Sequence, residues 1–266
     1  IYLAPHLSTG GMPQFLLKRI ESLMTYGEEQ HDIYVIEHNY YGHQFVVQRN
    51  KIVKLLRHKF YSNYDNKFDI LGVINIINPD IFHIDEMSER LDRGLITDLY
   101  NNDRTYRIVE TPHDVIFKPD DEKIFHPDLY LFCSPYHEDA FANLDSLYHT
   151  IQYPIANLAE PENKVKYRLE LGLDLTKRHV LNVGLWTPGK NQGEMLEIAR
   201  QYPNIEFHSI GNQADNFRDY WYPLMEDVPS NVHIYGEKDS EFIQKYMIAC
   251  DIFMFNSLNE CSPLAL

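Results

Sequence analysis

Residues 232–266 read VHIYGEKDSEFIQKYMIACDIFMFNSLNECSPLAL and are the most informative stretch of the chain. The apolar run VHIY predicts a strand, the polar GEKD a loop, SEFIQKYMIA a helix, and DIFMF a second strand. Two strands joined by a helix indicate parallel pairing with a crossover connection. The turn that follows holds Glu260 and then Pro263, a pattern typical of a helix start.

The same alternation of strand and helix runs upstream through the second half of the chain. We expect a helix within 160–173 that stops at Gly172, a strand–loop–helix unit over 179–203, and a strand over 205–212. A first series precedes these elements, and 156–163 is the natural linker between the two. We therefore predict an α/β protein with two domains, residues 1–157 and 158–266.

The first series begins with a strand at 1–5 and a helix from Pro13 that carries Leu16, Ile20, Leu23 and Met24 on one face. Further elements are predicted as a strand at 31–37, a helix at 68–77, a turn at Asn78-Pro79, a strand through Ile84, a strand within 104–114, a strand within 127–135, and a helix that opens at Ser134-Pro135. No element is predicted for 38–50. Parallel sheets bind ligands beyond the carboxyl ends of their strands, so the candidate loops are 6–12, 111–114, 184–192, 236–240 and 257–263.

Composition narrows the classes of partner. The chain has 266 residues, and its 24 basic against 39 acidic residues leave a formal charge of −15. Nucleic-acid binders concentrate Lys and Arg on one surface, and no such cluster is present, so we expect no nucleic-acid partner. Three scattered cysteines without a CxxC motif indicate a reducing, cytoplasmic location, and no apolar run is long enough to predict a transmembrane segment.

Two of the candidate loops suit a phosphate group. Gly10 and Gly11 precede a helix, where backbone N–H groups can approach an anion, although a simple tight turn explains them equally well. The third glycine of the GxGxxG fingerprint is absent, which argues against NAD. Lys190 lies between a strand and a helix N-terminus and could neutralise a diphosphate, or it could be a solvated loop lysine. The spacing is not that of a P-loop.

The other two candidates could bind hydroxyl groups. His113 sits in a Pro-His-Asp turn after a strand and could hydrogen-bond a substrate, or simply cap its turn with Asp114. Glu260 lies beside a helix N-terminus, where the helix dipole stabilises a carboxylate. Its carboxylate could equally accept two sugar hydroxyls.

Taken in order, these loops resemble the family-four retaining glycosyltransferases of the GT-B fold. Gly10-Gly11 is similar to the family's GG loop, VETPHD to its strand and histidine, and VLNVGLWTPGKNQ to its VGRLxxxKG segment. Residues 232–266 are similar to its GxxxxxxLxxxYxxADxFxxPSxxEGxPLxxxE segment, with Gly236, Tyr246, Asp251, Ser257, Glu260, Pro263 and Leu264 in register. The resemblance implies two Rossmann-like domains facing each other across a cleft, the second incomplete, because the family's second glutamate would fall two positions past Leu266.

The resemblance also implies a function, namely metal-independent transfer of a sugar from a nucleotide-diphosphate donor to an acceptor, with retention of configuration and no cofactor. It assigns Lys190 and the amides of Ser262, Pro263 and Leu264 to the departing diphosphate, and Glu260 and His113 to the sugar. Gly184, Gly236, Glu237 and Lys238 would line the donor site, and Gly10 and Gly11 the acceptor and phosphate side.

Two positions depart from the family pattern. The arginine that follows the first glycine is Leu185 here, and the glycine after the lysine is Asn191. A catalytically degenerate nucleotide-sugar-binding relative therefore stays open as an alternative, as does a nucleotide-sugar epimerase on the same fold. The donor base, the sugar and the acceptor (a glycan, lipid or protein) are not set by the sequence.

Overall fold

The computed structural model describes residues 1–8, 10–27, 31–40, 46–64, 68–101, 103–144, 146–152 and 163–260. Contacts between Cα atoms divide the described chain into two compact units, which we call unit 1 (residues 1–152) and unit 2 (residues 163–260). The predicted boundary at 157/158 and most of the predicted linker lie outside the described residues. Within the described ranges, no helix is long and apolar enough to cross a membrane.

Unit 1 is built on a seven-stranded parallel sheet with the order β3-β2-β1-β4-β5-β6-β7. The strands are β1 (Tyr2–Ala4), β2 (Val35–Glu37), β3 (Phe60–Ser62), β4 (Ile81–Ile84), β5 (Arg107–Glu110), β6 (Leu129–Phe132) and β7 (Tyr148–Thr150). The helices are α1 (Gly11–Tyr26), α2 (Val47–Leu56), α3 (Ile70–Ile77), α4 (Arg93–Leu99), α5 (Pro119–Glu122) and α6 (Pro135–Ala140), with 3-10 turns at Arg57–Lys59 and Ser88–Arg90.

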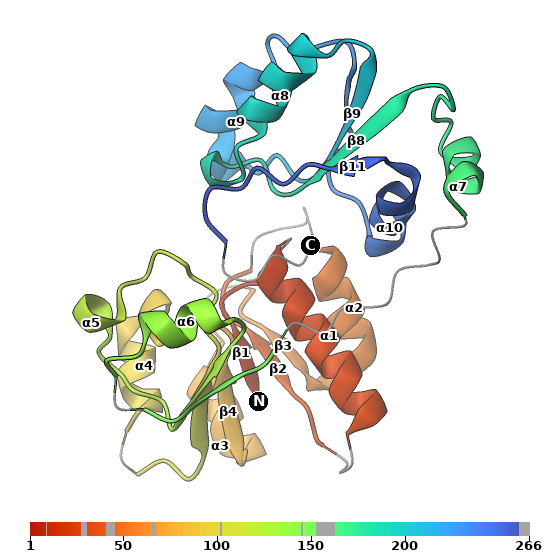
Figure 1. Ribbon diagram of the computed structural model, residues 1–266. Helices are drawn as coiled ribbons and strands as arrows, with labels where there is room; N and C mark the ends of the chain where they lie inside the picture. The colour runs from red at the N-terminus through yellow and green to blue at the C-terminus, as the bar shows by residue number, and fades with distance from the viewer. Residues whose placement is uncertain are drawn as a thin grey trace. The chain divides into compact units, whose positions relative to one another are not determined.

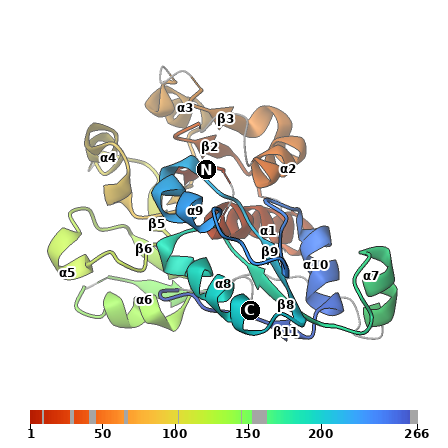
Figure 2. The ribbon, with the colours of Figure 1, turned by 90° about the horizontal axis from the view of Figure 1, so that it is seen from above.

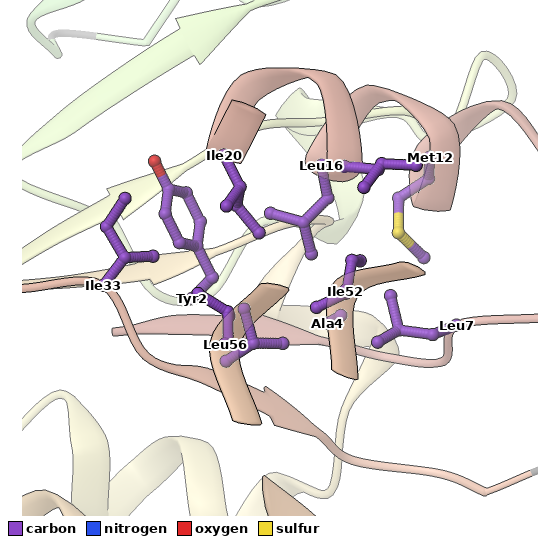
Figure 3. Close-up of a cluster of buried hydrophobic side chains, with 11 residues drawn as sticks. Tyr2, Ala4, Leu7, Met12, Leu16, Ile20, Ile33, Ile52 and Leu56 are labelled. Atoms are coloured by element: carbon purple, nitrogen blue, oxygen red, sulfur yellow. The ribbon is translucent and has the colours of Figure 1, made fainter. Parts of the chain in front are cut away.

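Helices cover both faces of this sheet (Figure 1). On one face, Leu16 and Ile20 of α1 point toward Ile52 of α2 and toward Ala4 of β1, as Figure 3 shows. On the other face, α3 and α4 pack against apolar residues of β1, β2, β4 and β5. Because both faces are buried, the central strands read as short continuous apolar runs, as is typical of parallel sheets.

Unit 2 has a four-stranded parallel sheet with the order β10-β9-β8-β11. Its strands are β8 (Arg178–Val183), β9 (Ile205–Ile210), β10 (Val232–Ile234) and β11 (Ile252–Phe253). Its helices are α7 (Lys164–Glu170), α8 (Gln192–Gln201), α9 (Arg218–Leu224) and α10 (Ser240–Ala249), with 3-10 turns at Pro188–Lys190 and Asp215–Phe217. Helices α8 and α9 lie on one face of the sheet, and α7 and α10 on the other (Figure 2).

Asp251, at the start of β11, fastens α7 to this sheet. Its carboxylate accepts hydrogen bonds from Lys164 Nζ, Arg168 Nη2 and the backbone N–H of His179, at 2.7, 2.7 and 2.8 Å. Burial opposes the charged form, but these three donors outweigh it and hold the pKa of Asp251 below its usual range. Asp251, one of the residues aligned with the family segment, therefore has a structural role.

Most predicted elements exist. Helix α7 ends just before Gly172, whose φ is +68°. Helix α3 ends just before Asn78, which adopts the left-handed region with φ 49°. Helix α1 begins at Gly11, earlier than Pro13, and its last turn exposes Met24, which is 56% accessible although it belongs to the predicted apolar face. The structure adds several elements that the sequence patterns did not predict: α2, α4, α9, β3 and β7.

Candidate active site

Three glycines line the carboxyl edge of the unit 2 sheet. Gly184 follows β8, Gly211 follows β9, and Gly236 comes two positions after β10. Backbone hydrogen bonds continue across them, from Gly184 N–H to Ile210 O at 3.0 Å and from Gly211 N–H to Gly236 O at 2.8 Å. A Cβ atom at Gly211 would lie 1.8 Å from the Gly184 carbonyl oxygen. Gly211 is therefore required by close packing against the Gly184 backbone. At Gly236 no atom lies within 4 Å of the Cβ position, so a ligand can approach the backbone there.

Lys190 ends the 3-10 turn between β8 and α8. The Thr187 hydroxyl accepts the Lys190 N–H at 3.2 Å and fixes the start of the turn. Asn191 then adopts the left-handed region, with φ 54° and ψ 41°, and leads directly into α8. Glycine adopts this conformation most easily and asparagine tolerates it. The resemblance places a glycine at this position, and backbone geometry explains why asparagine can replace it.

The structure brings Lys190 and Glu260 together. Lys190 Nζ donates a hydrogen bond to Glu260 Oε1, and the two side chains are 32% and 19% accessible. The Lys190 stem lies against Gly184, where a Cβ would sit 3.6 Å from its Cγ and Cδ atoms. One cation, one carboxylate and a glycine backbone thus meet at the end of β8.

The segment that follows β11 holds this arrangement in place. Asn182 Nδ2, on β8, donates to Met254 O and Asn256 Oδ1, both at 3.1 Å. Asn256 Nδ2 donates to the carbonyl of Asn191, and Leu258 N–H donates to Gly189 O at 2.8 Å. Residues 254–260 are therefore attached to the Lys190 turn on both of its sides.

Three of the other residues predicted to bind the nucleotide-sugar donor lie in the loop after β10, at the carboxyl edge of the unit 2 sheet. Gly236 has φ +67°, a conformation that favours glycine, and Lys238 lies 5.4 Å from the Phe242 ring centroid. Glu237 lies between them and is half-buried. Ser262, Pro263 and Leu264 lie outside the described residues. In the described loops after β8 to β11, Lys190 and Lys238 are the only Lys or Arg residues, and Leu185 leaves no arginine beside Gly184.

Unit 1 carries the other predicted residues. Gly10, with φ +149°, precedes α1, and Gly11 is its first residue. The His113 ring lies against Phe15 of α1, with centroids 5.3 Å apart, and its Nε2 is 3.4 Å from Asp85 Oδ1. Its backbone N–H donates to Glu86 Oε1 at 3.1 Å. Asp114 accepts hydrogen bonds from Arg90 and, within its own turn, from Ile116 N–H at 2.8 Å.

Sequence reasoning missed several residues at these edges. Gly211 could have been found, because a glycine stands at or just after the end of three successive apolar runs. Asn182, Asn256, Asp85 and Glu86 gave no such signal, because single polar residues near strand ends are common. Within the described ranges, no group of three His, Cys, Asp or Glu side chains could hold a metal ion.

Comparison of the whole structure defines its class, which is the GT-B fold. HepE from Anabaena, in complex with UDP and glucose, superposes with a TM-score of 0.68 at 16% identity, over 96% of this chain and 73% of that one. Sucrose-phosphate synthase from Thermosynechococcus elongatus gives a TM-score of 0.66 at 12% identity, over 99% and 77%. WaaG, a glycosyltransferase involved in lipopolysaccharide biosynthesis, gives 0.61 at 13% identity, over 98% and 75%. The predicted α/β fold with two Rossmann-like domains is confirmed.

Sequence comparison alone finds a weaker relationship. Over 110 residues the chain is 26% identical to an alpha-galactosylglucosyldiacylglycerol synthase of Streptococcus pneumoniae. The match covers 40% of this chain and 29% of that protein. No family model matches the sequence. The resemblance to GT-B glycosyltransferases is thus confirmed at the level of structure.

Proposed function

We propose that the protein is a glycosyltransferase that takes its sugar from a nucleotide-diphosphate donor and retains the anomeric configuration. The Lys190–Glu260 pair beside the glycine edge of unit 2 carries the proposal, because it sets a phosphate-binding cation next to a hydroxyl-binding carboxylate. Support comes from similar folds that were solved with UDP and glucose or with UDP-glucose, and from a weak relative named for glycolipid synthesis.

Each residue has a role in this proposal. Lys190 binds the diphosphate, and the positive end of the α8 helix dipole favours the same negative charge. Glu260 accepts hydroxyls of the donor sugar, and His113 is a further contact to the sugar. Gly184 and Gly236 let the donor approach the backbone, and Glu237 and Lys238 flank the nucleotide base. Gly10 and Gly11 belong to the acceptor side, and we keep the segment Ser262–Pro263–Leu264 at the diphosphate, with the backbone N–H groups of Ser262 and Leu264 as additional donors.

The reaction breaks the bond between the anomeric carbon and the diphosphate oxygen, and the diphosphate leaves with the bonding electron pair. The acceptor hydroxyl oxygen bonds to the same face of the anomeric carbon, and its proton passes to the departing phosphate oxygen. Negative charge develops on the diphosphate, so a preorganised cation speeds the reaction by stabilising that charge. We expect no metal requirement, and we place the protein in the cytoplasm on the strength of its cysteines.

Replacing Lys190 by alanine tests this mechanism. Loss of one preorganised donor to developing charge costs about 3–4 kcal/mol, so turnover should fall by roughly 10²–10³-fold. Lys166→Ala is the matched control, because Lys166 is exposed on α7, away from the strand ends. Unfolding curves should place both variants close to the parent protein. Unchanged turnover in folded Lys190→Ala would sink the mechanism.

The two alternatives are separated by following the donor. Incubation with a nucleotide sugar and an acceptor panel should give a glycosylated product with the donor's configuration. Free nucleotide released without product glycoside, or an epimerised sugar from donor alone, would favour the epimerase. Donor binding by calorimetry with no turnover under any condition would indicate the degenerate relative.

A further inference from the structure

The carboxyl edge of the unit 1 sheet is lined by carboxylates. Glu37 ends β2, Asp85 and Glu86 follow β4, and Glu110 ends β5. Three of them are almost wholly buried, with Glu37 at 1% accessible and Asp85 and Glu110 at 0%. An edge of this kind accepts hydrogen bonds readily and disfavours added negative charge.

Three cations near this edge are already paired within the described residues. Arg49 Nε donates to Glu37 Oε2 at 2.8 Å, and Arg90 Nε to Asp114 Oδ2 at 3.0 Å. Lys123, whose side chain is 0% accessible, is held by Glu110 and Glu89 at 2.6 and 2.8 Å. These pairs leave little positive charge for a phosphate or carboxylate on a ligand.

Arg19 is a further cation in this region, and it is turned inward. Its guanidinium lies 5.7 and 5.8 Å from the ring centroids of Tyr2 and Phe15, beneath α1. Its Nη1 atom is buried and has no hydrogen-bond partner among the described residues. A guanidinium enclosed by two rings is poorly placed to clamp a phosphate, which needs a planar fork of free donors.

Asp85 provides the observation that points to a ligand. Alternation along β4 puts it on the same side as His83, whose ring centroid lies 4.9 Å from that of Tyr2, and therefore on the α1 side. There Oδ1 faces His113, while Oδ2 is buried and has no partner among the described residues. An unpaired buried carboxylate oxygen is costly, and a hydroxyl donor would satisfy it.

Glu86 adds a second group of the same kind. It accepts the N–H groups of His113 and Met87 through Oε1, at 3.1 and 3.0 Å. Burial raises the pKa of Glu86 above its usual range. Phe15, which is buried against the His113 ring, packs beside these polar groups.

We propose that unit 1 receives an uncharged, hydroxyl-rich acceptor, a neutral sugar or the neutral sugar head of a larger molecule, and discriminates against phosphorylated acceptors. The proposal rests on the placement of Asp85 and Glu86 beside His113 beneath the start of α1, where Asp85 Oδ2 has no partner among the described residues. The nearby cations Arg49, Arg90 and Lys123 are paired with carboxylates. The net charge of −15 acts in the same direction by repelling polyanions. This inference rests on the proposed function, since it takes unit 1 as the acceptor side.

The test compares matched sugars that differ by one phosphate. Methyl glucoside and methyl galactoside are set against their own 6-phosphates, with binding to the full chain measured by ligand-observed NMR at low ionic strength. We expect the neutral members to bind at least tenfold more tightly. Equal or tighter binding of the phosphates, or no binding of the neutral glycosides, would overturn the inference.

Two variants test whether Asp85 is responsible for the preference for neutral sugars. Asp85→Asn should weaken binding of the neutral sugars several-fold and reduce the discrimination against phosphates, whereas Asp98→Asn, an exposed aspartate on α4, should leave both unchanged. If Asp85→Asn does not fold, Glu86→Gln serves in its place. Wild-type behaviour in a folded variant counts against the proposal. Binding of these sugars is measured without turnover. A finding that the protein consumes no nucleotide sugar would therefore refute the proposed function, whereas the binding test decides this inference separately.

Discussion

Lys190 and Glu260 are 70 positions apart in the sequence and form an ion pair at the end of β8. The free protein therefore already holds the two charges that a nucleotide-sugar donor would engage. A diphosphate that binds Lys190 has to share the ammonium with Glu260 or displace the carboxylate toward the sugar.

Glu260→Gln should separate sugar binding from nucleotide binding. The glutamine keeps the shape but loses the charge, so affinity for a nucleotide sugar should fall about tenfold or more, since a hydrogen bond to a charged group contributes roughly 1.5–3 kcal/mol. Affinity for the free nucleoside diphosphate should hold or rise, because Lys190 is released. Calorimetry with both ligands measures the difference, and Glu241→Gln, exposed on α10, is the control. An equal fall for both ligands would contradict the assignment of Glu260 to the sugar.

Gly211→Ala should damage the unit 2 sheet edge. The added methyl group would lie 1.8 Å from the Gly184 carbonyl oxygen, so the backbone must shift, at a cost of about 1–3 kcal/mol in the free energy of unfolding. Gly189→Ala is the matched control, since its Cβ would meet only the Thr187 hydroxyl, at 3.8 Å. Denaturant unfolding of both variants provides the comparison, and equal stability would show that the edge relaxes freely.

Asn191 can be tested from both directions. Its φ of 54° is strained for most residues, so Asn191→Ala should lower the free energy of unfolding by about 1–2 kcal/mol. Asn191→Gly should stay within roughly 1 kcal/mol of the parent, because glycine gains conformational ease but loses the hydrogen bond to Glu194, formed at 2.9 Å. Thermal and urea unfolding rank the three proteins. A stable alanine variant would mean that the turn does not require the left-handed conformation.

His208 should make unit 2 sensitive to acid. Burial, with the nearby His233 and His179, lowers the pKa of His208 to about 3, from an ordinary value of 6.5. The unfolded chain therefore binds a proton below about pH 6.5 while the folded protein does not. Stability is lost as the pH falls toward 3, by up to roughly 1.4 kcal/mol per pH unit from this group.

His208→Phe supplies the comparison for that pH dependence. The variant loses the hydrogen bonds with His179 and Tyr235, both 2.9 Å, so it should be less stable than the parent at pH 8. Its deficit should shrink by about 1–2 kcal/mol between pH 7 and pH 5, because it no longer resists protonation. Urea unfolding at several pH values measures the deficit, and a deficit independent of pH would assign the acid sensitivity to other groups.

The sequence predicted the elements whose apolar runs are buried on both sides. Strands β1, β4 and β8 belong to this group, whereas helix α8 was predicted from its single apolar face. Asn78 and Gly172 marked helix ends because both residue types tolerate positive φ. It did not predict α2, because VQRNKIVKLL buries only Ile52 and Leu56 and shows a weak apolar face. The expected burial of Met24 was wrong for the opposite reason. The apolar face of α1 continues in the sequence as far as Met24, but the last turn of the helix exposes this side chain.

The candidate site was predicted in part. Lys190 and Glu260 followed from the resemblance, and their contact is a property of tertiary structure that no local pattern encodes. The link through Asn182 and Asn256 depends on two strand ends that are neighbours only after β11 pairs with β8. The carboxylates around Asp85 were missed because each stands alone in the sequence, and they gather only at the edge of a parallel sheet.

Residues 254–260 and the Lys190 turn are joined by hydrogen bonds and therefore form one structural unit. A displacement of this segment would act on the turn through the hydrogen bonds of Asn256 and Leu258. Truncation after Phe253 would thus remove more than the Glu260 carboxylate: it would also remove two hydrogen bonds that hold the turn of Lys190, the proposed diphosphate ligand.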